Sequence, residues 1–178
     1  MINSYQSLIK NKLVTFTYKG NSKLPDFKDV TSVAVIPFTT DGQLVVVDLY
    51  QRGLDLPGGH VEPYETTPGQ TMTRETMEEA SMTVKVPVLV EVIESDYFED
   101  RVSYMLIYGA FVDQLFEFVP NSESRERVSI TKTDFIERYE AGDKILMGKV
   151  IDGAWKLLSK GSMHVYKDDA GHIGYTTK

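Results

Sequence analysis

The chain has no cysteine and only one tryptophan among its 178 residues. The absence of cysteine excludes disulfide bonds, zinc sites with thiolate ligands and thiol nucleophiles, and it fits a reducing compartment. No apolar run approaches the about 20 residues that a membrane-spanning helix needs. The polar segment 1–12 lacks the apolar stretch of a secretory signal. We therefore expect a cytoplasmic protein with no membrane partner.

The chain also lacks an excess of positive charge. Its 19 Lys and Arg residues against 26 Asp and Glu residues give a net charge of -7. Proteins that bind nucleic acids in general carry a basic patch, so we expect no nucleic-acid partner. A small phosphorylated ligand remains compatible, because divalent cations can join acidic side chains to phosphate oxygens. Monomer and homodimer both remain open.

What the chain does contain is typical of one ordinary globular domain: 42% of its residues are apolar and 25% are charged. We expect a single domain over residues 1–178, with its core at about 13–158. Hydrophobic periodicity separates strands from helices. The predicted strands are 13–18, 33–38, 44–48, 54–56, 84–93 and 102–112, the predicted helices 68–80, 131–139 and 145–158, and the predicted loops 21–29 and 120–126. This order predicts an α+β fold with helices on a mixed sheet.

Three carboxylates in the first predicted helix carry the strongest chemical signal. Glu75, Glu78 and Glu79 stand at i, i+3 and i+4, so they share one face of the helix. Taken alone, such a cluster is more often a solvated surface. Arg74 can pair with Glu78, but one cation does not balance three anions, whereas a hard divalent cation with oxygen ligands such as Mg²⁺ would.

Two glycines just before this helix strengthen that interpretation. Gly58 and Gly59 follow a short predicted strand and the breaker Pro57. Because glycine has no Cβ, the backbone there can approach a metal ion or ligand closely. A backbone carbonyl and a row of carboxylates could therefore converge on one small volume.

Together these residues resemble the signature of the Nudix hydrolases. Gly59 and Glu65 match its glycine and first glutamate, and Arg74, Glu75, Glu78 and Glu79 match its Arg-Glu-x-x-Glu-Glu core. The sequence departs from the signature in two ways. Eight residues rather than seven separate Glu65 from Arg74, and three other positions differ from the common residues, namely Tyr64, Thr76 and Ser81. The resemblance implies an α/β/α sandwich with a catalytic loop-helix-loop.

The resemblance also implies roles for individual residues. Glu75, Glu78 and Glu79, with a backbone carbonyl of Gly59 or Gly58, would hold Mg²⁺ or Mn²⁺. Arg74 would orient the carboxylates through a salt bridge. The bound metal would neutralise a diphosphate and lower the pKa of a water for attack at phosphorus.

The general base and the substrate contacts stay open at this point. Glu78 or Glu79 could take the proton of water, or a glutamate of the loop 120–126 could, namely Glu123 or Glu126. Arg52, just before the signature, could contact a phosphate or simply be exposed.

Three functions remain under the resemblance. We favour a MutT-like nucleoside triphosphate pyrophosphohydrolase that releases nucleoside monophosphate and pyrophosphate. The alternatives are a pyrophosphatase of ADP-ribose or a nucleotide sugar, and a Nudix-fold module that binds nucleotides without catalysis. A non-catalytic module usually has a broken glutamate set, and here all three glutamates remain.

Overall fold

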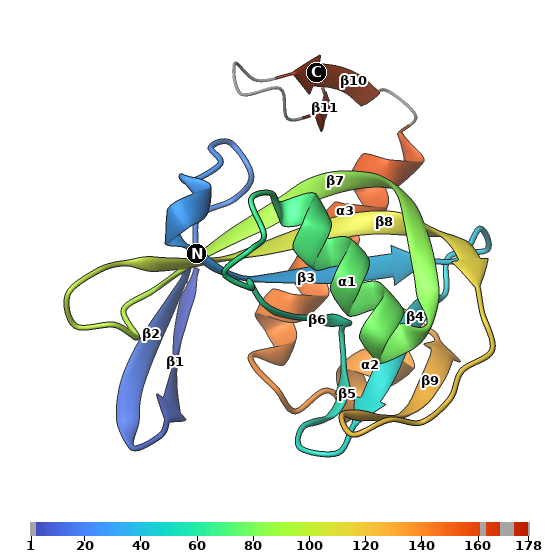
Figure 1. The fold of residues 1–178 in the computed structure, drawn as a ribbon, viewed down its shortest axis with the longest axis horizontal. Coiled ribbons are helices and arrows are strands. Elements are labelled where there is room, and N and C mark those ends of the chain that lie inside the picture. The colour runs from blue at the N-terminus through green and yellow to red at the C-terminus, as the bar shows by residue number, and fades with distance from the viewer. Residues whose placement is uncertain (1–2, 161–162, 168–172, 178) are drawn as a thin grey trace.

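A large mixed sheet with helices on both faces forms the body of the computed structural model, which describes residues 3–160, 163–167 and 173–177 (Figure 1). The strands are β1 (Ser4–Ile9), β2 (Lys12–Tyr18), β3 (Val30–Phe38), β4 (Leu44–Leu49), β5 (Gly53–Asp55), β6 (Gly58–His60), β7 (Met82–Ser95), β8 (Ser103–Leu115), β9 (Ser124–Ile130), β10 (Met163–Lys167) and β11 (Ile173–Thr177). The helices are α1 (Pro68–Ala80), α2 (Lys132–Arg138) and α3 (Lys144–Ser159), with a 3-10 turn at Phe27–Asp29.

The sheet runs in the order β1-β2-β7-β8-β3-β4-β5, with β6 paired to β3 and β9 paired to β4. β3 and β8 are parallel, whereas the neighbouring pairs β7–β8 and β3–β4 are antiparallel. Figure 1 shows α1 across one face of the sheet and α2 and α3 behind the other. This arrangement confirms the predicted α+β sandwich with a mixed sheet.

Each face of the sheet has its own apolar core. Met72 of α1 packs with Val33, Val35 and Leu106 of the central strands on one face. Most of the remaining buried residues gather on the other face, where α2 and α3 contribute Phe135, Met147, Val150, Ile151, Ala154 and Leu158. A strand whose alternate residues are buried on both faces must be apolar throughout, and β3 is almost continuously buried.

α3 approaches the sheet closely at one point. A Cβ built on Gly109 of β8 would lie 2.9 Å from the Cβ of Ala154 on α3. Two small residues therefore set the distance between this helix and the sheet.

Several predicted boundaries were wrong. The segment 120–126 was expected to be a loop, but β9 begins at Ser124 and pairs with β4, so Glu126 lies on a strand opposite Asp48. Residues 4–9 form a strand that the sequence analysis missed. No element is predicted after residue 158, yet β10 and β11 pair antiparallel.

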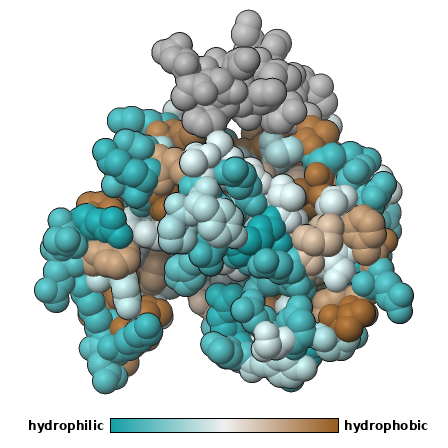
Figure 2. Space-filling view, viewed as in Figure 1, coloured by the Kyte–Doolittle hydropathy of each residue, from teal (hydrophilic) through white to brown (hydrophobic). Residues whose placement is uncertain are grey.

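Hydrophilic and apolar residues both occur on the surface of the molecule (Figure 2). The face drawn in Figure 2 is mostly hydrophilic, with apolar residues scattered over it. No helix in the described part of the chain is long and apolar enough to cross a bilayer.

Candidate active site

The helix α1 is set up by local sequence at both of its ends. At its start, the side-chain oxygen of Gln70 accepts hydrogen bonds from the backbone N–H groups of Thr66 (2.7 Å) and Thr67 (3.1 Å), and Pro68 is the first helical residue. At its end, Ser81 adopts the left-handed conformation with φ 46° and ψ 50°. Glycine favours that conformation at a helix end, so Ser81 ends the helix in the geometry that a glycine would give.

Arg74 connects three carboxylates and one carbonyl. Its Nε lies 2.9 Å from Glu65 Oε1, and its Nη1 lies 2.7 Å from Glu75 Oε1 and 3.0 Å from Glu78 Oε2. Its Nη2 donates to the backbone carbonyl of His60 at 2.8 Å. The side chain of Arg74 is only 18% exposed, and such buried multidentate contacts fix a guanidinium in place.

Glu65 reaches this network despite the extra residue before Arg74. Its side chain is 2% exposed. It accepts hydrogen bonds from the hydroxyl of Thr71 at 2.7 Å and from the backbone N–H of Glu62 at 2.8 Å. Burial by itself raises the pKa of Glu65, but the hydrogen bonds from Arg74, Glu62 and Thr71 outweigh it and hold the pKa below its usual value. The longer spacing therefore leaves Glu65 ionised and paired.

The strand β6 lies directly against the carboxylates of α1. A Cβ on Gly59 would come within 2.7 Å of the carboxyl carbon of Glu75. The backbone N–H of Gly58 donates to Glu79 Oε2 at 2.9 Å. Gly58 also faces β3, because a Cβ there would lie 2.5 Å from the Cα of Ala34. A larger residue at Gly58 would collide with β3, and one at Gly59 would collide with the Glu75 carboxylate.

Burial makes two of these carboxylates unusually easy to protonate. It raises the pKa of Glu79 to about 7; the negative charges of Glu75 and Glu123 add to the rise, while the N–H of Gly58 and the charge of Arg52 oppose it. Burial also raises the pKa of Glu75, although its contact with Arg74 works against this. A divalent cation would relieve this repulsion between buried negative charges.

The donor set fits a hard divalent cation. Three carboxylate oxygens have no hydrogen bond or ion pair to any residue that the structure describes: Glu75 Oε2, Glu78 Oε1 and Glu79 Oε1. Among the described residues, no three His, Asp or Glu side chains already surround one point. Arg74 holds one oxygen of Glu75 and one of Glu78, and the 58% exposed Glu78 can turn in solvent.

The loop before β9 lies beside α1. The side-chain amide of Asn121 donates to the backbone carbonyl of Glu78 at 2.8 Å, and the backbone N–H of Tyr50 donates to the carbonyl of Glu123 at 3.0 Å. The charge of Glu123 raises the pKa of both Glu75 and Glu79. Glu123 is therefore near the carboxylates, whereas Glu126 sits within β9 and contributes to neither shift.

Arg52 lies in the turn between β4 and β5, near the same carboxylates. Its side chain is 51% exposed, and its Nε is 3.5 Å from Asp55 Oδ2. Its positive charge lowers the pKa of Glu79. A largely exposed guanidinium beside acidic side chains is suited to an anionic ligand.

Sequence reasoning placed Arg74, Glu75, Glu78, Glu79 and Gly59 together, and the structure brings them together. It missed Asn121, because an asparagine in a polar loop carries no periodicity.

The sequence model of the NUDIX domain matches residues 28–146. The fold is similar to that of the Bacillus subtilis pyrophosphohydrolase BsRppH, at 20% identity and a TM-score of 0.63 over 88% of this chain and 96% of that chain. A NUDIX hydrolase from Nitrosomonas europaea is 18% identical, with a TM-score of 0.56 over 70% of this chain and 86% of that one. The NUDIX domain of Shewanella oneidensis NrtR, solved with ADP ribose, is 15% identical, with a TM-score of 0.55 over 71% and 86%. A search of curated proteins gave no match.

Proposed function

The chain belongs to the Nudix family of hydrolases, which act on phosphoanhydride bonds of nucleoside diphosphate derivatives, and from this premise we propose that it hydrolyses nucleoside triphosphates with Mg²⁺ or Mn²⁺. The products would be a nucleoside monophosphate and pyrophosphate. The observation that carries the proposal is the set of three glutamates on α1 beside the glycines of β6; each glutamate has one carboxylate oxygen without a partner among the described residues.

Glu75, Glu78 and Glu79, with the backbone carbonyl of Gly59, would hold the metal ion. When bound, the ion would neutralise the phosphate chain and favour ionisation of an attacking water. Arg74 acts as a positioning residue, because it fixes one oxygen of Glu75 and one of Glu78. Its contacts with Glu65 and with the backbone carbonyl of His60 tie the helix to the preceding loop and to β6.

The reaction forms a bond between a water oxygen and the phosphorus of the nucleoside monophosphate, and it breaks the bond from that phosphorus to the pyrophosphate oxygen. A carboxylate must take the proton of water. Glu78 or Glu79 could take it, but the pKa of about 7 for Glu79 belongs to the metal-free site, and a bound cation would lower it. Glu123 is the alternative base, since its charge already acts on Glu75 and Glu79. Arg52 would contact the phosphate chain.

We also propose that one domain carries the activity. The core on the α2 and α3 face includes Leu158 near the end of α3, and Phe16 of β2 packs against it. Elements on both sides of the matched residues 28–146 therefore share one core.

The test is to incubate the protein with Mg²⁺ and a panel of nucleoside triphosphates, ADP-ribose and nucleotide sugars, and to identify the products. Release of nucleoside monophosphate and pyrophosphate from triphosphates supports the proposal. Cleavage confined to ADP-ribose or nucleotide sugars would replace it with the second activity. Binding without any cleavage would indicate a nucleotide-binding module instead.

A further inference from the structure

The last turn of α1 carries two of the three glutamates of the candidate active site. The helix ends at Ala80, so Glu78 and Glu79 both lie in this turn. The carbonyl groups of a last helical turn have no partner within the helix, and helix ends fray unless other groups hold them. A metal site that uses Glu78 and Glu79 therefore needs contacts from outside the helix to keep this turn in place.

Side chains from β9 and from the loop before it bond to carbonyls of this turn. The Nη1 of Arg127, on β9, donates to the carbonyl oxygens of Ala80 at 2.8 Å and Ser81 at 2.9 Å. The side-chain amide of Asn121 donates to the carbonyl oxygen of Glu78 at 2.8 Å. Both donors lie far from α1 in the chain, so tertiary packing holds the end of this helix.

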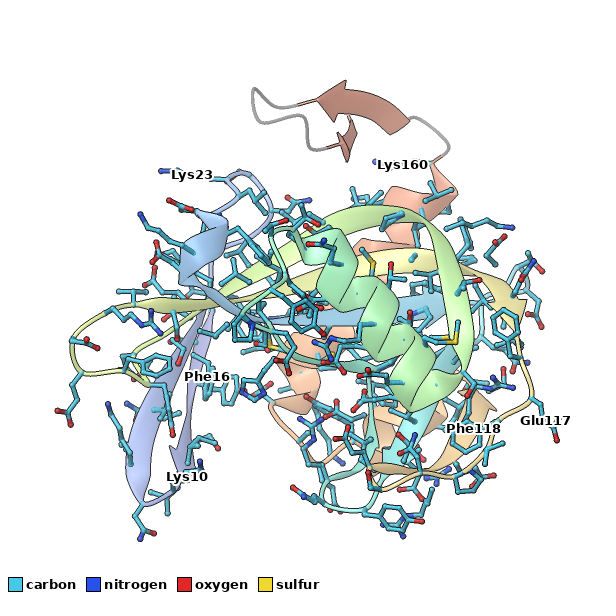
Figure 3. All side chains as sticks on the ribbon, viewed as in Figure 1. Lys10, Phe16, Lys23, Glu117, Phe118 and Lys160 are labelled. Carbon is cyan, nitrogen blue, oxygen red and sulfur yellow. The ribbon has the colours of Figure 1, made fainter. Side chains whose placement is uncertain are left out.

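The guanidinium of Arg127 serves the helix end rather than a carboxylate. Its central carbon lies 5.8 Å from the centre of the Phe118 ring, and Figure 3 labels Phe118 beside the end of α1. Burial lowers the pKa of Arg127, and no carboxylate in the described part of the chain opposes this shift. A positive charge at the end of a helix interacts favourably with the helix dipole, so Arg127 contributes both hydrogen bonds and charge there.

Ser81 makes the end of α1 depend more strongly on these contacts. Its φ of 46° and ψ of 50° are left-handed, a conformation that costs free energy for a residue with a Cβ and persists where surrounding contacts enforce it. The carbonyl of Ser81 accepts from Arg127 and also from the backbone N–H of Phe116, at 2.9 Å. A glycine, the residue of the Nudix signature at this position, would need less support.

We propose that Arg127 and Asn121 are positioning residues of the hydrolytic site: they hold the last turn of α1 and so keep the carboxylates of Glu78 and Glu79 in place for a divalent cation. The inference rests on the proposed function, because it concerns the same glutamates. Both residues act through main-chain carbonyls of the helix. Groups that orient metal ligands commonly contribute about 10-fold to 100-fold to metal affinity or activity.

Two measurements on the full chain test this inference without turnover. The first is hydrogen exchange of the α1 amides in EDTA, which reports local opening of the last turn in the absence of metal. The second is Mn²⁺ binding, followed by the loss of the electron paramagnetic resonance signal of free Mn²⁺. The value of kcat for nucleoside triphosphates with Mg²⁺ is measured beside them.

The variants separate the contacts from other effects. Arg127→Met keeps a long side chain without a donor, and Arg127→Lys restores a charged donor. Asn121→Asp keeps the oxygen that accepts from the backbone N–H groups of Glu123 and Ser124 but loses the donor to Glu78. The matched control is Arg101→Met, because Arg101 also lies over a phenylalanine ring, that of Phe98 at 4.7 Å, but in the loop between β7 and β8.

We expect residues 77–81 to exchange at least about tenfold faster in Arg127→Met and Asn121→Asp, while residues 72–76 change less, because each variant loses a hydrogen bond of the last turn. The dissociation constant for Mn²⁺ should rise, and kcat should fall, by about tenfold. Arg127→Lys should recover most of both losses, and Arg101→Met should match the wild type. Combined with Ser81→Gly, Arg127→Met should have a smaller effect, since glycine adopts the left-handed conformation readily.

Wild-type Mn²⁺ affinity in both Arg127→Met and Asn121→Asp would overturn the inference even if their last turns exchange faster, because the contacts would then be structural only. Absence of Mn²⁺ binding by the wild type would also overturn it. If Arg127→Met does not fold, Asn121→Asp and the combination with Ser81→Gly decide the result. Weaker Mn²⁺ binding in the variants, with no cleavage of any nucleotide by the wild type, would support the positioning role and contradict the proposed function.

Discussion

The Nε of Arg74 lies 2.9 Å from Oε1 of Glu65, although eight residues stand between them where the Nudix signature has seven. The extra residue is absorbed in the turn before α1, where the side chain of Gln70 collects the backbone N–H groups of Thr66 and Thr67. The helix therefore starts in a capped conformation, and Glu65 keeps its place against Arg74.

This pair should stabilise the fold. In Glu65→Ala, the buried Arg74 loses one of its three carboxylate partners and keeps Glu75 and Glu78. We therefore expect the free energy of unfolding to fall by about 3 kcal/mol, the low end of the cost of breaking a buried ion pair. Urea unfolding measures this change. Lys85→Ala is the control, because its pair with Asp113 is 51% and 43% exposed, and it should cost less than about 1 kcal/mol. Equal effects of the two variants would contradict the role given to Glu65.

Replacing each glycine of β6 by alanine should affect a different property, activity at one position and stability at the other. In Gly59→Ala the new Cβ meets the Glu75 carboxylate, so we expect a large loss of kcat with a small loss of stability. In Gly58→Ala it meets the backbone of β3, so the main loss should be stability. Gly69→Ala is the control, since its nearest contact is 3.9 Å away and helical alanine should be neutral or stabilising by up to about 1 kcal/mol. Activity and urea unfolding of the three variants test this order.

The sequence predicts those features of the site that depend on neighbouring residues in the chain, and it does not predict those that depend on tertiary packing. The face shared by Glu75, Glu78 and Glu79 follows from helical spacing alone, and the structure has it. The contact of Glu65 with Arg74 depends on the path of a turn, which spacing does not specify. The position of Glu126 was wrong because β9 is a polar edge strand whose alternation is weak. The sequence also could not show that the hydroxyls of Tyr5 and Tyr139 both lie near Gly142, since tertiary packing alone brings β1 close to the end of α2.

Glu79 should make metal binding depend on pH. Its pKa of about 7 in the folded protein lies above the ordinary value of 4.5. Mg²⁺ needs the ionised carboxylate, so the apparent affinity should rise with pH up to about 7 and then level off, by at most about tenfold per pH unit for one proton. Calorimetric titration of Mg²⁺ at pH values from about 5.5 to about 8.5 measures this rise in affinity. In Glu79→Gln the rise attributable to this group should disappear.

The same shift has the opposite effect on the metal-free protein. Between pH 4.5 and about 7, Glu79 keeps a proton in the folded state that it has already lost in the unfolded state. Its contribution to the free energy of unfolding is therefore fully present below pH 4.5 and is lost as the pH rises through about 7. Urea unfolding in EDTA should show this decline in the wild type, and a smaller one in Glu79→Gln. A steeper decline in the variant would argue against a raised pKa for Glu79.

Glu123 and Glu126, the two candidates for the general base outside α1, lie in different places. Glu123 is near the carboxylates of α1, whereas Glu126 is on β9 opposite Asp48. If Glu123 is the base, Glu123→Gln should lower kcat by about 100-fold, as for other general bases. Glu126→Gln is the matched control and should leave kcat nearly unchanged. Full turnover in both variants would assign the proton to a glutamate of α1.

The most direct measurement is the initial rate of nucleoside monophosphate release from nucleoside triphosphates, with and without Mg²⁺, for the wild type, Glu79→Gln and Glu117→Gln. Glu117 is an exposed residue of the loop after β8 and serves as the control for loss of one negative charge. We predict metal-dependent release in the wild type and in Glu117→Gln, and a loss of at least about 100-fold in Glu79→Gln. Full activity of Glu79→Gln, or an equal loss in Glu117→Gln, would contradict a hydrolytic site built on the glutamates of α1.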